Sequence, residues 1–99
     1  MGIDLHWRSS DGTLLDAVYD EASLLSEVIQ EADDGLLATI DPYRTTRFLA
    51  AQAGTLIEEL ERIREKAGNV ERRIAIGRLL LVLRAAEGGV GDWLEFVGD

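Results

Sequence analysis

The sequence predicts an α+β domain in which a small, mostly antiparallel sheet packs against an acidic helix and a helical hairpin. Two observations predict this class. Segments near both ends of the chain alternate between apolar and polar residues, which is the period of a half-buried strand. Longer segments between them repeat apolar residues at the spacing of an amphipathic helix. The predicted sheet consists of an N-terminal hairpin, a central strand and a C-terminal strand, and such strands beside a helical pair are typical of α+β domains.

The N-terminal hairpin is expected over residues 3–8 and 13–19. Apolar and polar residues alternate in both segments. Asp11 and Gly12 lie between them, and Asp-Gly favours a tight turn because glycine adopts a positive φ at little cost. The alternative is an extended arm that leads into a helix.

An acidic helix is expected over residues 20–32. Asp20 can cap its first turn, and acidic residues there complement the positive end of the helix. Gly35 supplies the turn that ends it. Residues 36–40 are short, apolar and bounded by turn residues, so we expect the central strand there, and Pro42 ends it because proline cannot donate to a strand ladder.

The helical hairpin is expected to follow. Its first helix begins between Pro42 and Thr46 and runs to about Ala67, because apolar residues recur there at alternating intervals of four and three. Its second helix runs from Val70 to about Glu87. The predicted inner face of the second helix consists of Ile74, Gly77, Leu81 and Ala85.

The C-terminal strand, over residues 93–97, is expected to pair with the N-terminal strand. Both segments alternate, and each is too short to be stable alone. A chain of 99 residues is typical of one domain, which we expect over residues 1–99. The predicted core consists of Ile3, Leu5, Trp7, Ile40, Phe48, Leu56, Leu60, Ile63, Ile74, Leu81, Leu94 and Phe96.

Composition excludes several classes of function. The chain contains 19 acidic and 10 basic residues and has a formal net charge of −9, whereas nucleic-acid binding needs clustered Lys and Arg. It has no cysteine and one histidine, His6, so we expect no metal site, and no motif indicates a cofactor. The apolar run over residues 79–83 is too short to cross a bilayer, and the first residues do not resemble a secretory signal. We therefore expect no nucleic-acid or membrane partner and a cytoplasmic location.

The segment over residues 41–48 is the least generic part of the chain. At the predicted start of a helix, backbone N–H groups and the helix dipole favour a phosphate or a carboxylate. The candidate contacts for a ligand or partner are Asp41, Tyr43, Arg44, Thr46 and Arg47. The alternative is structural, with Asp41 or Thr45 as the helix cap and Pro42 fixing the turn.

Two further groups of polar residues have a functional and a structural interpretation. Residues 20–40 carry six acidic and no basic side chains, which either form a solvated helix face or steer a basic partner. His6 and Asp4 share one face of the first strand, as a general base and its orienting carboxylate would. Alternation on a solvated strand face produces the same pattern without chemistry. No nucleophile elbow or phosphate-binding loop is present, so we predict no catalytic residues and no enzyme activity.

The start, the centre and the end of the chain resemble a family of short bacterial proteins. That family has a central Asp-Pro-Tyr-Gly-Asp-Thr-x-Phe-Asn stretch and a Trp-Phe-Ile-Gly-Asp-like end. The residues that carry the resemblance are Met1-Gly2-Ile3-Asp4-Leu5, Asp41-Pro42-Tyr43, Thr46, Phe48, Gln52 and Trp93-Leu94-Glu95-Phe96-Val97-Gly98-Asp99. Arg44 and Thr45 stand in place of Gly-Asp, and Leu49 stands in place of Asn. The resemblance implies no particular activity.

These patterns lead to a functional hypothesis with alternatives. Size, charge and the lack of catalytic groups favour a non-enzymatic interaction protein, such as a small acidic inhibitor of the kind that immunity proteins are. One alternative is a small-molecule or anion-binding domain that uses the turn over residues 41–47. Another is an enzyme that uses Asp41, Tyr43 and His6. Apolar residues around most of the helix from Val70 predict a homodimer through the helical hairpin, unless the acidic helix covers them in a monomer.

Overall fold

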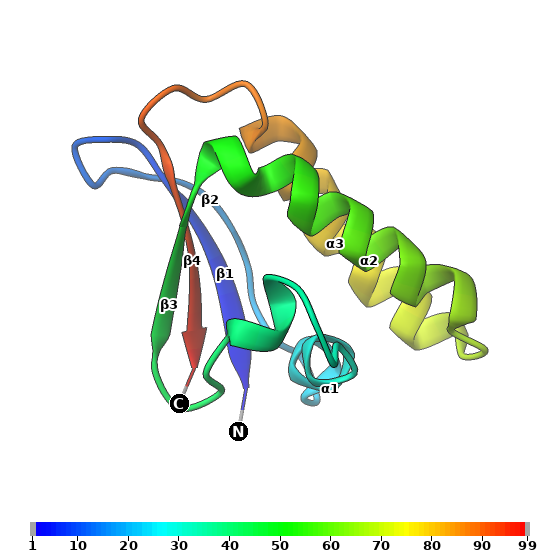
Figure 1. Cartoon of the computed structure of the whole chain (residues 1–99). Coiled ribbons are helices and arrows are strands. Elements are labelled where there is room, and N and C mark those ends of the chain that lie inside the picture. The colour runs from blue at the N-terminus through cyan, green and yellow to red at the C-terminus, as the bar shows by residue number, and fades with distance from the viewer. Residues whose placement is uncertain (1, 99) are drawn as a thin grey trace.

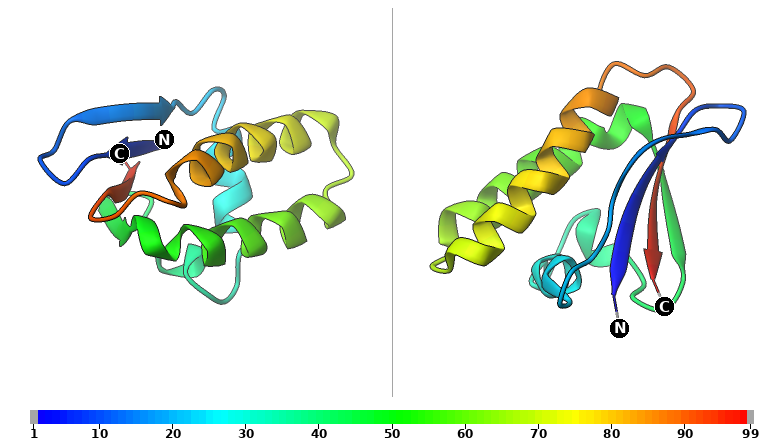
Figure 2. Two further views of the ribbon diagram at one scale, coloured as in Figure 1. Left: turned by 90° about the horizontal axis from the view of Figure 1, so that it is seen from above. Right: turned by 180° about the vertical axis from the view of Figure 1, so that it is seen from behind.

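The structure is a computed structural model that describes residues 2–98. In this range, four strands form one antiparallel sheet in the spatial order β2-β1-β4-β3, and the helices cover one of its faces (Figures 1 and 2). The strands are β1 (Ile3–Arg8), β2 (Leu14–Val18), β3 (Thr45–Leu49) and β4 (Trp93–Gly98). The helices are α1 (Leu24–Gln30), α2 (Ala53–Lys66) and α3 (Val70–Ala86), with short 3₁₀ helices η1 (Leu37–Thr39) and η2 (Ala50–Gln52). The predicted α+β class is confirmed.

The predicted pairing of the two ends of the chain is also confirmed. β1 pairs with β4 along its whole length, with Leu5 opposite Phe96 and Trp7 opposite Leu94. β1 and β4 are therefore the two central strands, and β2 and β3 are the edges. The hairpin of β1 and β2 turns at Gly12, whose φ is 90°. The central residues of the sheet thus come from segments at opposite ends of the sequence.

The segment over residues 36–40 is not the predicted strand, because η1 occupies it. The carboxylate of Glu59, on α2, accepts hydrogen bonds from the backbone N–H groups of Leu36 and Leu37 at 3.0 and 2.9 Å. Gly35 has a φ of 80°, and a Cβ at this position would lie 2.6 Å from Glu59 Oε2. A short apolar segment fits either a strand or a helical turn, and here a carboxylate from a distant helix decides the outcome.

The predicted start of the hairpin is wrong as well. Residues 45–49 form the edge strand β3, and α2 begins only at Ala53. β3 pairs with β4, with Phe48 opposite Leu94, so the β-branched and aromatic residues of this segment pack on the sheet. The side chain of Gln52 then accepts the backbone N–H of Leu49 at 2.9 Å, which fixes the turn into the helices.

Helix α3 has the predicted span but buries a different face. Ile74 and Leu81, predicted to be core residues, are 59% and 71% exposed. The buried residues of α3 are Ala75, Ile76, Leu79, Leu80, Val82, Leu83 and Ala86. This wider apolar arc packs against α1, α2 and the sheet, and the narrower stripe with Ile74 and Leu81 is left in solvent. Figure 2 shows α3 beside α2 and above α1.

Helix α1 lies between the sheet and the helical hairpin (Figure 1). It begins at Leu24, later than predicted, because Ala22 and Ser23 adopt positive φ angles of 53° and 62°. Asp20 nevertheless caps it, as predicted: its carboxylate accepts the backbone N–H groups of Leu25 and Ser26 at 2.9 and 3.1 Å. α1 therefore covers part of α3, the arrangement that we considered as the alternative to a dimer.

Most of the predicted core is confirmed. The correctly predicted buried residues are Ile3, Leu5, Ile40, Phe48, Leu56, Leu60, Leu94 and Phe96. Trp7 and Ile63 are only partly buried and pack against the core. The indole N–H of Trp7 donates to Asp92 at 3.1 Å, so this side chain keeps a polar contact at the rim of the core.

Candidate functional site

The face of the sheet that the helices leave uncovered is the candidate site, and we call it the outer face (Figures 1 and 2). Residues that are opposite each other in an antiparallel sheet project to the same side, so the register assigns the side chains of this face. Its three rows across the strands are Ala17–His6–Glu95–Arg47 in the middle, Leu14–Arg8–Trp93–Leu49 on one side, and Asp4–Val97–Thr45 on the other.

The centre of the outer face is a triad of Arg8, Glu95 and Arg47. Nε of Arg8 donates to one carboxylate oxygen of Glu95 at 2.7 Å, and Nε of Arg47 donates to the other at 2.6 Å. Glu95 is only 6% exposed although no helix covers this face. The two arginine side chains thus occupy both oxygens of a buried carboxylate.

Glu95 stays ionised because of its partners. Burial disfavours the charged form, but the hydrogen bonds and the positive charges of Arg8 and Arg47 outweigh it. Together they hold the pKa of Glu95 below its usual value. The triad is therefore charged at neutral pH, with two cations around one anion.

His6 lies beside Glu95 in the middle row. Both ring nitrogens are buried, and neither has a hydrogen-bond partner among the described residues. Its ring contacts that of Tyr19 edge to face, with centroids 6.0 Å apart. A buried polar group without a partner costs about 1–3 kcal/mol, so any contribution of His6 to stability comes from its ring contact with Tyr19 and not from its nitrogens.

Exposed apolar and aromatic side chains lie on the same face as the triad. Trp93 is 38% exposed although it lies on a central strand, and Leu49 and Tyr19 are more exposed still. Tryptophan, tyrosine and arginine are the residue types that most often dominate binding energy at protein interfaces. A shallow depression in this face is lined by His6, Arg8, Thr45, Arg47, Glu95 and Val97. The outer face therefore has the composition of an interface with a charged centre.

Four of the five ligand contacts predicted from the sequence lie together in one turn, and Arg47 lies apart from them in the triad. Asp41, Tyr43 and Arg44 form a turn in which the Asp41 carboxylate accepts the Tyr43 N–H at 2.9 Å. The hydroxyl of Thr46 accepts the Asp41 N–H at 3.1 Å, so this side chain is used internally. Arg47 alone lies in the triad. No helix begins here, so neither the predicted anion site at a helix N-terminus nor the alternative helix cap is present.

The predicted pair of His6 and Asp4 does not form either. The Asp4 carboxylate accepts the backbone N–H of Asp20 at 2.7 Å, and His6 has no hydrogen-bond partner in the described part of the chain. Asp4 therefore joins β1 to the segment before α1 and does not orient the imidazole.

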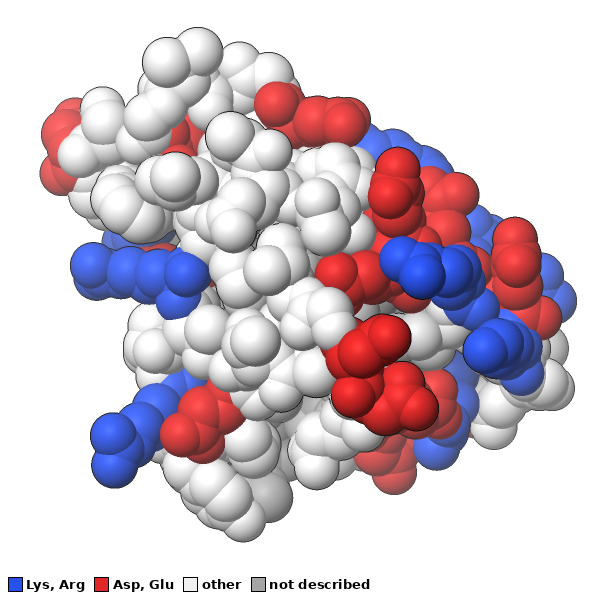
Figure 3. All heavy atoms as spheres, viewed as in Figure 1, with Lys and Arg blue, Asp and Glu red and all other residues white. Residues whose placement is uncertain are grey.

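Three of the six acidic side chains of residues 20–40 are paired with arginines of α3. Arg72 pairs with both Glu27 and Glu31, and Arg78 pairs with Glu21 at 3.7 Å. In Figure 3, basic and acidic side chains are mixed over the helical side of the molecule. The segment is thus less available to a basic partner than its sequence charge indicates.

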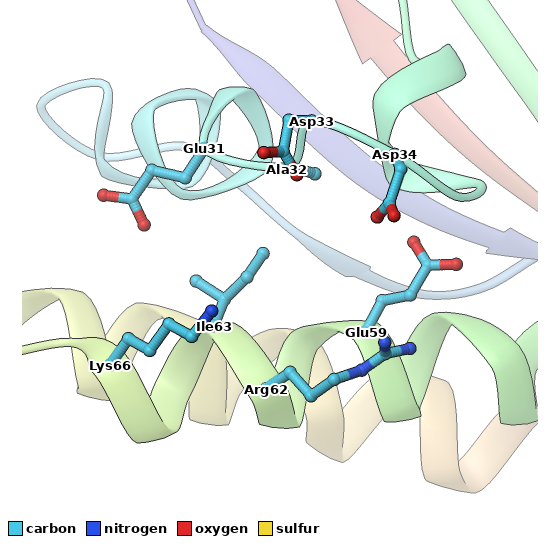
Figure 4. Close-up of a pocket in the computed structure, with 8 residues that line it drawn as sticks. All are labelled: Glu31, Ala32, Asp33, Asp34, Glu59, Arg62, Ile63 and Lys66. Atoms are coloured by element: carbon cyan, nitrogen blue, oxygen red, sulfur yellow. The ribbon is translucent and has the colours of Figure 1, made fainter.

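A second hollow lies between the end of α1 and helix α2 (Figure 4). It has a volume of about 220 Å³, and its charged lining residues are Glu31, Asp33, Asp34, Glu59, Arg62 and Lys66. Glu59 is already engaged by η1 and Glu31 by Arg72. Residues 2–98 contain no cluster of side chains suited to hold a metal ion. This hollow is less distinctive than the outer face.

Comparisons of the chain with protein-family models, with curated proteins and with solved structures find no match. The resemblance to the short bacterial proteins stays a prediction. Among the described helices, none combines the length and the apolar character that crossing a membrane requires.

Sequence reasoning missed Glu95 as a residue of the candidate site. Its place between Trp93 and Val97 in an alternating strand indicates one polar position on the outer face. The alternation of the first strand predicts that Arg8 lies on its polar face. Only the register of β4 with both neighbours brings the three side chains of the triad together.

Proposed function

We propose that the protein is a non-enzymatic interaction protein and that the outer face is its binding surface. One observation carries the proposal: exposed Trp93 and Leu49 lie in the row next to Glu95 and Arg47, and exposed Tyr19 contacts His6, on a sheet face that no helix within residues 2–98 covers (Figure 1). Exposed apolar patches beside polar residues mark interaction sites, and aromatic residues and arginine are enriched at protein interfaces. The cytoplasmic location stays a prediction.

The inhibitor hypothesis is the finer form of this proposal. The net charge of −9 supports attraction of a partner that is basic as a whole, since charge steers association at long range. The internal pairing of α1 with Arg72 argues that the acidic helix is not the contact surface itself. In this hypothesis, the net negative charge of the whole molecule attracts the partner, and the outer face makes the direct contact.

The alternative of an anion-binding domain keeps only Arg47 from the residues predicted for it. Asp41 and Thr46 are engaged in the turn before β3, and Arg44 lies 3.9 Å from the Asp41 carboxylate. The Asp41 carboxylate beside Arg44 would repel an anion at the turn, so the triad, with two cations and one anion, fits this alternative better.

Site-specific photo-cross-linking in the cells of origin tests the proposed surface. A photoreactive residue at Thr45, on the outer face, should link the protein to one specific partner, and excess unmodified protein should compete. The matched control is the same residue at Glu65, which is exposed on α2. The proposal fails if Thr45 yields no adduct or if both positions yield the same adducts.

We also propose that α3 forms a homodimer contact. Val70, Ile74 and Leu81 are exposed on one side of α3, and with Gly77 between them their spacing is four, three and four. This is the spacing of a two-helix seam, which a second copy of α3 can match across a twofold axis. α1 packs against α3 and reaches the stripe only near Ile74, which lines a hollow with Leu24 and Leu25 and is still 59% exposed.

Sedimentation at micromolar concentration tests the dimer. The unchanged chain should sediment at twice its mass of 10.9 kDa, and Leu81→Glu should sediment as a monomer. Leu15→Glu, at an exposed leucine outside α3, should leave the dimer intact. A single species near the chain mass for the unchanged protein contradicts the dimer.

A further inference from the structure

The triad has an excess of positive charge in an acidic protein. Arg8 and Arg47 share the single carboxylate of Glu95, so the depression that they line has two cations and one anion. The cluster around Arg72 has the opposite excess, because this one cation pairs with two anions, Glu27 and Glu31. Another carboxylate on the outer face, that of Asp4, accepts the backbone N–H of Asp20. One further carboxylate would make the centre of the outer face neutral.

Arg47 is positioned to receive such a group. Its Nε is held by Glu95 at 2.6 Å, which fixes the plane of the guanidinium. No described residue accepts a hydrogen bond from its two terminal nitrogens, and the side chain is 64% exposed. A guanidinium offers its remaining N–H groups as a planar fork that matches both oxygens of a carboxylate.

Arg8 is less available. Besides its contact with Glu95, Nη1 of Arg8 donates to the backbone oxygen of Gly12 at 3.0 Å, and the side chain is two-thirds buried. Arg8 therefore supplies positive charge and holds Glu95 in place, whereas Arg47 makes the direct contact.

The residues around Arg47 indicate which chemical groups accompany the carboxylate in the ligand. Leu49 follows in the same strand two residues on, and Trp93 lies opposite Leu49. Both are exposed, so an apolar group beside the carboxylate would be buried on binding. We propose that the outer face binds an acidic side chain of a partner protein, flanked by apolar residues, through the terminal nitrogens of Arg47. This inference rests on the proposed function of the outer face.

The probe for this contact is the peptide N-acetyl-Leu-Glu-Leu-amide, and its control is the peptide with Gln in place of Glu. Nitrogen–proton NMR spectra report the Nε–H of Arg47 and the indole N–H of Trp93. The Glu peptide should shift both signals saturably at millimolar concentration. Arg47→Gln should weaken its binding about tenfold or more, since a hydrogen bond to a charged group is lost.

The matched variant is Arg62→Gln, which removes the same charge from the exposed surface of α2 and should bind like the unchanged protein. Equal shifts from the Glu and Gln peptides would overturn the carboxylate contact while leaving the outer face as an apolar binding surface. Equal weakening by both variants, or no saturable shift at all, would also overturn it. Cross-linking from Thr45 is independent of these outcomes and tests the surface separately.

Discussion

The two faces of the sheet are made by the same strands but have opposite characters. The inner face is apolar and closed: Leu5, Phe48 and Phe96 are buried under the helices, and the two phenylalanine rings meet edge to face at 5.8 Å. The outer face is open and buries a charged group, Glu95, under arginine side chains. Alternation along β4 sends Phe96 to one side and Glu95 to the other.

This difference separates residues that stabilise the fold from residues that do not. Apolar burial on the inner face stabilises the protein by about 25 cal/mol per Å². A buried ion pair on average gains little over apolar residues of similar size, because desolvation offsets the attraction. The unpartnered nitrogens of His6 add a cost. The outer face thus carries polar groups that stabilise the fold less than the apolar residues of the inner face do, which is consistent with the binding surface that we propose there.

The largest expected effect compares neighbouring residues of β4. Phe96→Ala should destabilise the protein by about 3–5 kcal/mol, because it removes a fully buried ring from the inner face. Val97→Ala, on the outer face, should cost less than about 1 kcal/mol. Chemical denaturation of both variants measures the difference. Equal losses would mean that the outer face is also part of the core.

A similar comparison applies to the two sides of α3. Leu80→Ala should cost about 2–5 kcal/mol because Leu80 is buried. Leu81→Ala, one position on, should cost less than about 1 kcal/mol in the monomer, which corrects the sequence-based prediction for this residue. Thermal or urea unfolding at low protein concentration separates the two, and a large loss for Leu81→Ala would contradict the observed orientation of the helix.

The smallest expected effect concerns Glu95. Glu95→Gln removes the shared anion and leaves Arg8 and Arg47 near each other without it. The loss should be about 1–2 kcal/mol at neutral pH, below that for a fully buried pair because Arg47 is largely solvent-exposed. Denaturation at pH 7 measures this loss.

The acid sensitivity of the same group provides the control. The pKa of Glu95 is lowered in the folded protein relative to its usual value of 4.5. Its contribution to stability is therefore complete above about pH 4.5 and is lost as the pH falls through the lowered folded-state pKa. The difference in stability between the unchanged protein and Glu95→Gln should shrink in that window. A difference that is constant down to the acid limit would mean that the triad is not charged.

Sequence patterns predicted the two ends of the chain and the helix from Val70 better than the segments between them. The strands at both ends and the helix from Val70 have strong periodicity, and they lie where predicted, whereas α2 begins later than predicted. Residues 36–40 were predicted to form a strand but contain a 3₁₀ helix, and residues 45–49 were predicted to lie in a helix but form a strand. Such short segments have weak local preferences, so contacts with Glu59 and β4 determine their structure.

The candidate site was only partly predictable for a related reason. Arg47 was among the predicted contacts, but Glu95 is 48 residues away from it and 87 residues away from Arg8. No local pattern connects residues at such separations.

The sequence by itself determined the α+β class, the alternation of each long strand and the apolar surplus of the helix from Val70, because these are local properties of side-chain spacing. The tertiary structure alone decided which arc of α3 is buried, since that depends on where α1, α2 and the sheet make contact. It also decided that Arg8, Glu95 and Arg47 meet, since strand register joins residues that are distant in sequence. Periodicity shows which side chains share a face of their own strand, and only pairing between strands sets their neighbours on that face.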